Sequence, residues 1–125
     1  MPDLTITQRF GSSVAFDGTT KVLSINLNDL TDGGDLNDGN GLDITGLSQA
    51  NINIYASKIL WALLLLSQAN QPETNNDETV GVYITNEGKR SFPRNNVSQF
   101  GYRLVATGFK NDTSGINLDP DAIAS

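Results

Sequence analysis

Histidine and cysteine are both absent from this chain of 125 residues. Without histidine there is no imidazole to act as a general base or as a metal ligand. Without cysteine there are no disulfides, thiolate zinc sites or cysteine nucleophiles, and the redox compartment stays open. The two absences together exclude histidine-based catalytic triads and imidazole or thiolate metal sites.

Basic residues are scarce. Eight Lys and Arg stand against fourteen Asp and Glu, which gives a formal net charge of −6. A sequence-independent grip on DNA or RNA needs clustered Lys and Arg, and an anionic membrane surface repels an acidic protein. We therefore expect neither a nucleic acid nor a membrane as the partner of this protein.

Long hydrophobic runs are missing as well. The longest covers residues 59–66, eight residues in all, whereas a membrane-spanning helix needs about 20. The first four residues lack the basic and apolar regions of a secretory signal. We expect a soluble protein without an export signal, in a compartment that the sequence leaves unknown.

The first third of the chain has the patterns of strands. Residues 4–7 alternate between apolar and polar side chains, as in a half-buried strand. Residues 14–16 lead into Asp17-Gly18, a dipeptide that suits a tight turn, and residues 20–27 alternate again. The sequence therefore predicts a strand followed by a β-hairpin.

An acidic segment follows the predicted hairpin. Residues 29–43 contain five aspartates and no basic residue, and Ca²⁺ prefers such oxygen ligands. Asp35, Asp38 and Asp43 are the weak candidate metal ligands, because no starting position satisfies the EF-hand spacing and the calcium nonapeptide occurs as one imperfect copy. We favour a solvated loop whose side chains bond to their own backbone, with a Ca²⁺ site as the alternative.

A long helix is the clearest predicted element. Ser48 is a suitable N-cap, Pro72 stops the helix, and residues 49–70 lie between them. One face carries an apolar stripe, formed by Ile52, Ala56, Ile59, Leu60, Leu63 and Leu66. The opposite side carries Trp61, Leu64 and Leu65, so residues 59–66 are hydrophobic all round.

A helix that is apolar on every face must be covered on every face. Each large apolar side chain that is fully buried contributes about 1.5–3 kcal/mol. A sheet covers one side of the helix, and the other side needs a second layer. We predict that Trp61, Leu64 and Leu65 form an interface with another subunit; the alternative is that the C-terminal segments of the same chain cover them.

The second half returns to strand patterns. Residues 80–85 alternate, residues 86–89 resemble a turn, and residues 90–92 form a short strand that Pro93 ends. Residues 97–110 are predicted to be one long strand. Lys89, Arg90 and Arg94 beside Phe92 are suited to hold a carboxylate or phosphate, although we favour a charged hairpin that resists edge-to-edge aggregation.

These patterns together predict an α+β fold. Residues 1–110 are expected to form a single domain, an antiparallel sheet of four to six strands with one long, strongly hydrophobic helix packed on it. Residues 111–125 have few apolar anchors and are expected to form an extended C-terminal arm.

The functional expectation is a structural protein and not an enzyme, because the residues form no catalytic constellation and no cofactor motif. We expect a homo-oligomer or a subunit of a viral-type assembly, for example a capsid decoration, neck or tail component of a tailed phage. The alternative is a ligand-binding module for Ca²⁺ or a carbohydrate that uses the acidic segment 29–43. Apart from that Ca²⁺, no cofactor is expected.

Overall fold

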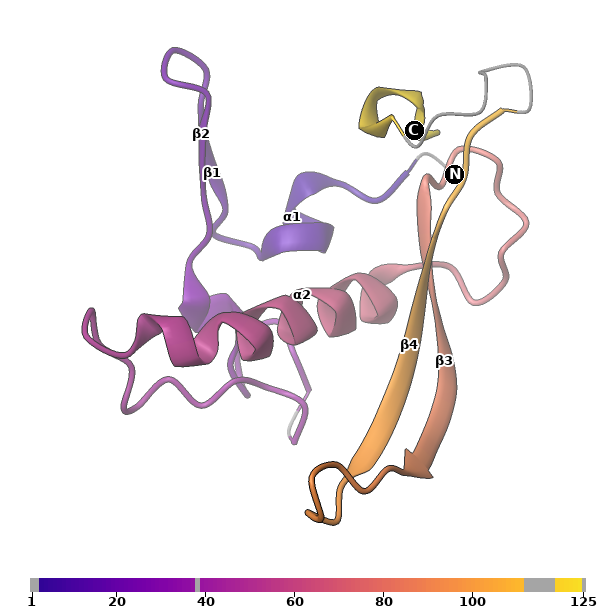
Figure 1. Ribbon diagram of the computed structural model, residues 1–125. Helices are drawn as coiled ribbons and strands as arrows, with labels where there is room; N and C mark the ends of the chain where they lie inside the picture. The colour runs from indigo at the N-terminus through magenta and orange to yellow at the C-terminus, as the bar shows by residue number, and fades with distance from the viewer. Residues whose placement is uncertain (1–2, 38, 112–118, 125) are drawn as a thin grey trace. The chain divides into compact units, whose positions relative to one another are not determined.

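The computed structural model describes residues 3–37, 39–111 and 119–124 (Figure 1). It divides into two compact units. The N-terminal unit is Leu4–Pro72, and the C-terminal unit combines Met1–Asp3 with Glu73–Ser125.

The chain begins with a short helix, α1 (Ile6–Phe10). The Thr5 hydroxyl accepts a hydrogen bond from the Gln8 backbone N–H (3.3 Å), and the Thr5 N–H donates to the Gln8 side-chain oxygen (2.8 Å). This reciprocal pair is a capping box. The strand predicted at residues 4–7 is therefore wrong, because a capping signal outweighs an alternation of only four residues.

The predicted N-terminal hairpin is confirmed, but it is short. Strand β1 (Ala15–Asp17) pairs with β2 (Val22–Ser24) in an antiparallel register that places Phe16 opposite Leu23. The second strand was predicted to reach residue 27. It stops earlier because the Asn26 side chain accepts from the Asn28 N–H (3.0 Å) and caps a 3₁₀ helix, η1 (Leu27–Leu30).

The long helix ends where the sequence predicts and begins later. A 3₁₀ turn, η2 (Ile52–Tyr55), leads into α2 (Ala56–Asn70). The helix ends at Asn70, two residues before Pro72. Ser48 does not cap it, because the Ser48 N–H donates to the Asn51 side-chain oxygen (2.7 Å) in a separate turn. The capping signal at Ser48 thus belongs to the preceding loop.

The core of the N-terminal unit lies between α2 and the acidic segment. Leu30 and Leu36 from that segment are buried against Ala62 and Leu66 of α2. Six half-buried side chains pack around these four, namely Ile25, Leu27, Leu42, Ile59, Leu63 and Leu65. The leucines of the predicted loop, together with α1, η1 and η2, thus contact α2 in this unit.

The C-terminal unit is built on one long antiparallel ribbon. Strand β3 (Val82–Ser91) pairs with β4 (Phe100–Gly108), and Figure 1 shows the two strands twisting side by side. Beyond β3, the Arg94 N–H donates to the Val97 carbonyl (2.9 Å). Asn95 (φ 50°) and Asn96 (φ 63°) lie between them, so the hairpin closes in a two-residue turn with both residues left-handed.

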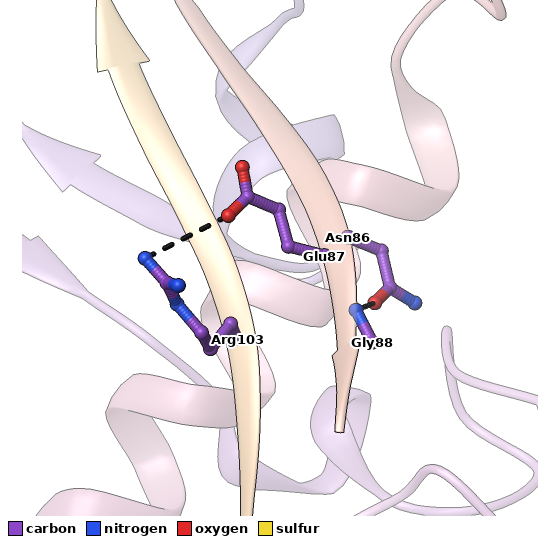
Figure 2. A network of polar contacts seen from close by, with 4 residues as sticks. All are labelled: Asn86, Glu87, Gly88 and Arg103. Carbon is purple, nitrogen blue, oxygen red and sulfur yellow. Dashed lines mark hydrogen bonds and ion pairs between the residues drawn. The ribbon is translucent and has the colours of Figure 1, made fainter. Parts of the chain in front are cut away.

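The turn predicted at residues 86–89 is wrong, because these residues form a β-bulge inside β3. Asn86 lies opposite Leu104 and Lys89 opposite Tyr102, so that Glu87 and Gly88 share a single position of β4. Figure 2 shows the bulge: the Glu87 carboxylate lies 3.7 Å from Arg103, and the Gly88 N–H donates to the Asn86 side chain (2.8 Å). A turn-like sequence, Asn-Glu-Gly, is accommodated here without reversing the chain.

The fold is thus a mixture of helix and antiparallel strands, as predicted. One sheet of four to six strands is not shown, since the described residues hold two separate pairs, β1–β2 and β3–β4. Of the predicted arm 111–125, residues 112–118 and 125 lie outside the described residues. A 3₁₀ helix, η3 (Pro120–Ala122), is followed by Ala124, whose N–H donates to the Phe109 carbonyl (2.8 Å).

The stretch Ile52–Asn70 is long and apolar enough, by length and composition alone, to cross a membrane. Its uninterrupted apolar run of eight residues, 59–66, spans about 12 Å of helix, against about 30 Å for a hydrocarbon core. Ala62 and Leu66 within that run are already buried in the protein. The expectation that no membrane is involved stays a prediction.

Candidate interaction surfaces

The acidic segment is tied to the chain by its own carboxylates. Asp29 is only 8% exposed and accepts hydrogen bonds from the Ser13 N–H (2.7 Å) and hydroxyl (3.1 Å). Asp35 accepts from the Ser12 N–H (2.7 Å) and hydroxyl (3.1 Å). These bonds span 16 to 23 residues of sequence, so the segment is a folded part of the unit and more than a solvated connection.

Of the three candidate metal ligands, the structure describes Asp35 and Asp43, and these two bond to different parts of the chain. Asp35 bonds to Ser12, as above, whereas Asp43 accepts from the Thr45 N–H (3.0 Å), which lowers the pKa of Asp43 below its ordinary value. Asp38 lies outside the described residues. Within the described part of the chain, no three His, Cys, Asp or Glu side chains come together as a metal site would need. Calcium binding stays an untested alternative.

A recess lies between the acidic segment and α2. It has a volume of about 240 Å³, and its wall is formed by residues of both elements: Asn40, Gly41, Leu42, Asp43, Lys58, Trp61, Ala62 and Leu65. The Lys58 ammonium lies 4.8 Å from the centre of the Tyr55 ring. The Asp43 carboxylate and the Trp61 indole thus belong to the same recess, which we call the Trp61 recess.

The three predicted interface residues occupy different environments. Trp61 is 36% exposed, Leu64 is half-buried, and Leu65 packs on the core. The most exposed apolar residue of α2 is instead Leu60, at 61%, which the sequence placed on the inward stripe. Ile59, Leu63 and Leu66 of the predicted inward stripe do pack in the core, so the prediction is wrong at Leu60 and right at these three.

The distal part of the β3–β4 hairpin exposes aromatic side chains next to cations. Phe100 and Tyr102 are 64% and 59% exposed, and the Lys89 ammonium lies 5.0 Å and 5.9 Å from the centres of their rings. Phe92 is also exposed, and its ring covers the space above Gly101. We call residues 87–103 the basic-aromatic hairpin end.

Charge is unevenly distributed between this hairpin end and the remaining sequence. Residues 87–103 contain four basic residues and one acidic residue, a net charge of +3. The remaining 108 residues contain four basic against thirteen acidic residues, a net charge of −9. The sequence showed the cluster of Lys89, Arg90 and Arg94. It did not show that Tyr102 pairs with Lys89 across the ribbon, or that the Phe100 ring lies near the same ammonium, because the sequence pattern assigns residues 86–89 to a turn.

A second hollow, in the C-terminal unit, contains the acidic residues Asp77 and Glu78 and has a volume of about 280 Å³. The Thr79 hydroxyl (2.5 Å) and N–H (2.9 Å) donate to Asp77 and lower the pKa of its carboxyl group to about 2. A carboxylate with so low a pKa is a weak general base and is not protonated near neutral pH. The low pKa argues against Asp77 as the general acid or base of a reaction near neutral pH.

No protein-family model, curated protein or solved structure matches the chain. The chemistry and contacts of the described residues therefore carry the functional argument.

Proposed function

We propose that the protein is a non-enzymatic structural subunit that assembles with further copies of itself. The observation that carries this proposal is the amount of apolar side chain left in water. Among the described residues, twelve large hydrophobic side chains are exposed, whereas seven hydrophobic residues are buried. Each large apolar side chain that is buried in an interface contributes about 1.5–3 kcal/mol, so association offers a stabilisation that the isolated chain forgoes.

The β3–β4 ribbon supports the same proposal. An isolated two-stranded ribbon is marginally stable in water, and further strands or a packed neighbour are needed to stabilise it. In its distal half, Phe92, Phe100 and Tyr102 are exposed to solvent. Strands from a second subunit would extend this ribbon into a larger sheet, of the size predicted from the sequence.

The helix α2 offers a second exposed apolar surface. Leu60, Trp61 and Leu64 lie on the side of α2 away from Ala62 and Leu66. We propose this set in place of the predicted set of Trp61, Leu64 and Leu65, because Leu65 is already used by the core.

The alternative ligand-binding function receives less support. Among the described residues, no three His, Cys, Asp or Glu side chains come together as a metal site would need. The carboxylates of Asp29, Asp32, Asp35 and Asp43 each accept a backbone N–H and so help to hold the segment in place. An assembly of the viral type remains the setting in which we place the protein, with neither nucleic acid nor membrane as its partner.

The test is the mass of the protein in solution. Light scattering on a size-exclusion column should give a discrete multiple of the 13.4 kDa chain mass at protein concentrations of about 10–100 μM. A mass of 13.4 kDa throughout this range would overturn self-assembly. Calcium added to the same samples tests the alternative, since a ligand that binds only the folded state raises the melting temperature.

A further inference from the structure

We propose that the basic-aromatic hairpin end of one copy docks into the Trp61 recess and onto the acidic segment of a second copy. This inference rests on the proposed self-assembly and names the two surfaces that meet. It replaces an unspecified apolar association with a contact between two different parts of the chain.

Charge indicates which surface the hairpin end binds. Residues 87–103 carry a net charge of +3, which favours an acidic partner. Residues 29–43 carry five aspartates and no basic residue, a net charge of −5. Asp32, Asp35 and Asp43 are exposed and remain able to accept charge-assisted hydrogen bonds, because a carboxylate has about four lone-pair sites.

Apolar chemistry points to the same pair of surfaces. Phe100 and Tyr102 are large, rigid and mostly exposed, which is the character of residues that anchor interfaces. The Trp61 recess offers apolar walls, formed by Leu42, Trp61 and Leu65, beside the acidic segment. Its wall also holds one cation, Lys58. An aromatic ring in the recess and cations over the aspartates would combine a buried anchor with a polar rim.

A contact between two hairpin ends is disfavoured by the same charges. Edge-to-edge pairing would bring Lys89, Arg90 and Arg94 of both copies together, and like charges that face one another cost several kcal/mol at an interface. A nucleic acid is the other polyanion that a basic and aromatic hairpin would suit. The net charge of −6 on the whole chain opposes that partner and leaves a second copy as the favoured one.

The two surfaces differ, so the contact is head-to-tail. Each copy would offer a hairpin end to one neighbour and a recess to another. Such a contact generates a closed ring if the rotation between copies closes, and an open filament if it does not. Both products are assemblies of the structural kind proposed above.

The first experiment compares Arg90→Glu with Lys21→Glu, two exposed positions at which the charge changes by the same amount. Lys21 lies in the β1–β2 turn, outside both surfaces. Sedimentation velocity should show that Arg90→Glu weakens assembly at least about tenfold, whereas Lys21→Glu leaves it near the wild-type level. Equal effects of the two changes would overturn the proposal, and so would an unchanged assembly in Arg90→Glu.

The second experiment restores the contact by exchanging its charges. Lys89→Glu/Arg90→Glu makes the hairpin end acidic, and Asn40→Lys/Asp43→Lys makes the recess basic. Each double variant alone should assemble poorly, whereas an equimolar mixture should recover a complex, because the acidic hairpin of one meets the basic recess of the other. Folded circular dichroism spectra of both variants accompany the measurement. Two folded variants that fail to associate in the mixture would contradict the docking.

The outcomes separate the docking from the wider proposal. A monomeric wild type removes self-assembly and the docking with it. If the wild type assembles and the charge variants of the hairpin end and of the recess assemble equally well, self-assembly stands and the docking is wrong. A labelled oligothymidine serves as the polyanion probe: binding that Lys89→Glu/Arg90→Glu abolishes, with assembly unchanged, would assign the hairpin end to nucleic acid and overturn the proposal.

Discussion

The Lys89 ammonium lies 5.0 Å from the centre of the Phe100 ring, on the face of the ribbon that also carries Tyr102. The bulge at Glu87 and Gly88 is responsible for this arrangement. Continued from the Asn86–Leu104 pair without a bulge, the register would place Lys89 opposite Gly101 and on the other face, because a slip of one residue reverses every side chain. The extra residue therefore brings the cation and the two rings together.

The bulge predicts a difference between two glycines. Gly88 has φ +81°, whereas Gly18 lies outside the left-handed range, and neither has a neighbouring atom within 4 Å of an added Cβ. Gly88→Ala should therefore destabilise the protein by about 1 kcal/mol through backbone strain alone, and Gly18→Ala by much less. Urea unfolding measures both. Equal stabilities for the two variants would contradict the bulge geometry.

The ribbon also shows what the sequence could and could not predict. The alternation over residues 97–110 correctly predicted β4, since strand periodicity depends only on local spacing. The reversal of the chain was misplaced, because Asn-Glu-Gly and Asn-Asn both tolerate positive φ and only the pairing with β4 decides which one turns. The basic cluster was visible in the sequence, whereas its contact with Phe100 and Tyr102 depends on that pairing.

Helix α2 was also predicted correctly as an element, whereas its buried face was predicted only in part. The apolar spacing predicted the helix but not the full orientation of its faces. Residues 59–66 are apolar in every direction, and the leucines that cover them are 17 or more residues away in the sequence. Leu65→Ser should cost about 2–4 kcal/mol, because Leu65 packs on the core. Leu60→Ser should change the stability of the subunit by less than about 0.5 kcal/mol, because Leu60 is 61% exposed. Thermal unfolding of the two variants, at protein concentrations low enough to keep the chain monomeric, compares them, and the reverse order would show that the sequence-based orientation was right.

The acidic segment yields a third prediction. Asp29→Ala would remove the part-buried acceptor of the Ser13 N–H and hydroxyl, and would leave a gap where a side chain that is 8% exposed now lies. The expected loss of unfolding free energy is about 1–3 kcal/mol. Asn37→Ala, at an exposed position of the same segment, serves as the control and should stay within about 0.5 kcal/mol. If Asp29→Ala leaves the free energy of unfolding unchanged, the segment does not contribute to the folded unit and is a solvated connection.

Acid should reveal the contact between Asp77 and Thr79. The folded-state pKa of Asp77 is lowered to about 2 by the Thr79 hydroxyl and N–H, below an unfolded value of about 3.9. The folded state therefore binds the proton less readily, and the stabilisation is present above pH ~4 and lost as the pH falls toward 2. The stability gap between wild type and Asp77→Asn should close over that range in urea titrations.

Thr79→Val gives a direct readout of the same contact, because it removes the hydroxyl and keeps the backbone N–H. Carboxyl NMR titration should show the pKa of Asp77 rising toward its ordinary value in this variant. An Asp77 that titrates identically in the two proteins would contradict the hydrogen bond from Thr79.

Self-assembly through surfaces of opposite charge is the central claim, and sedimentation velocity of the wild-type chain over concentration and salt tests it most directly. The account predicts a discrete species heavier than 13.4 kDa that grows with concentration at low ionic strength. In about 1 M sodium chloride, where the screening length falls to about 3 Å, this species should diminish. A 13.4 kDa monomer at every concentration in both salts would contradict the account.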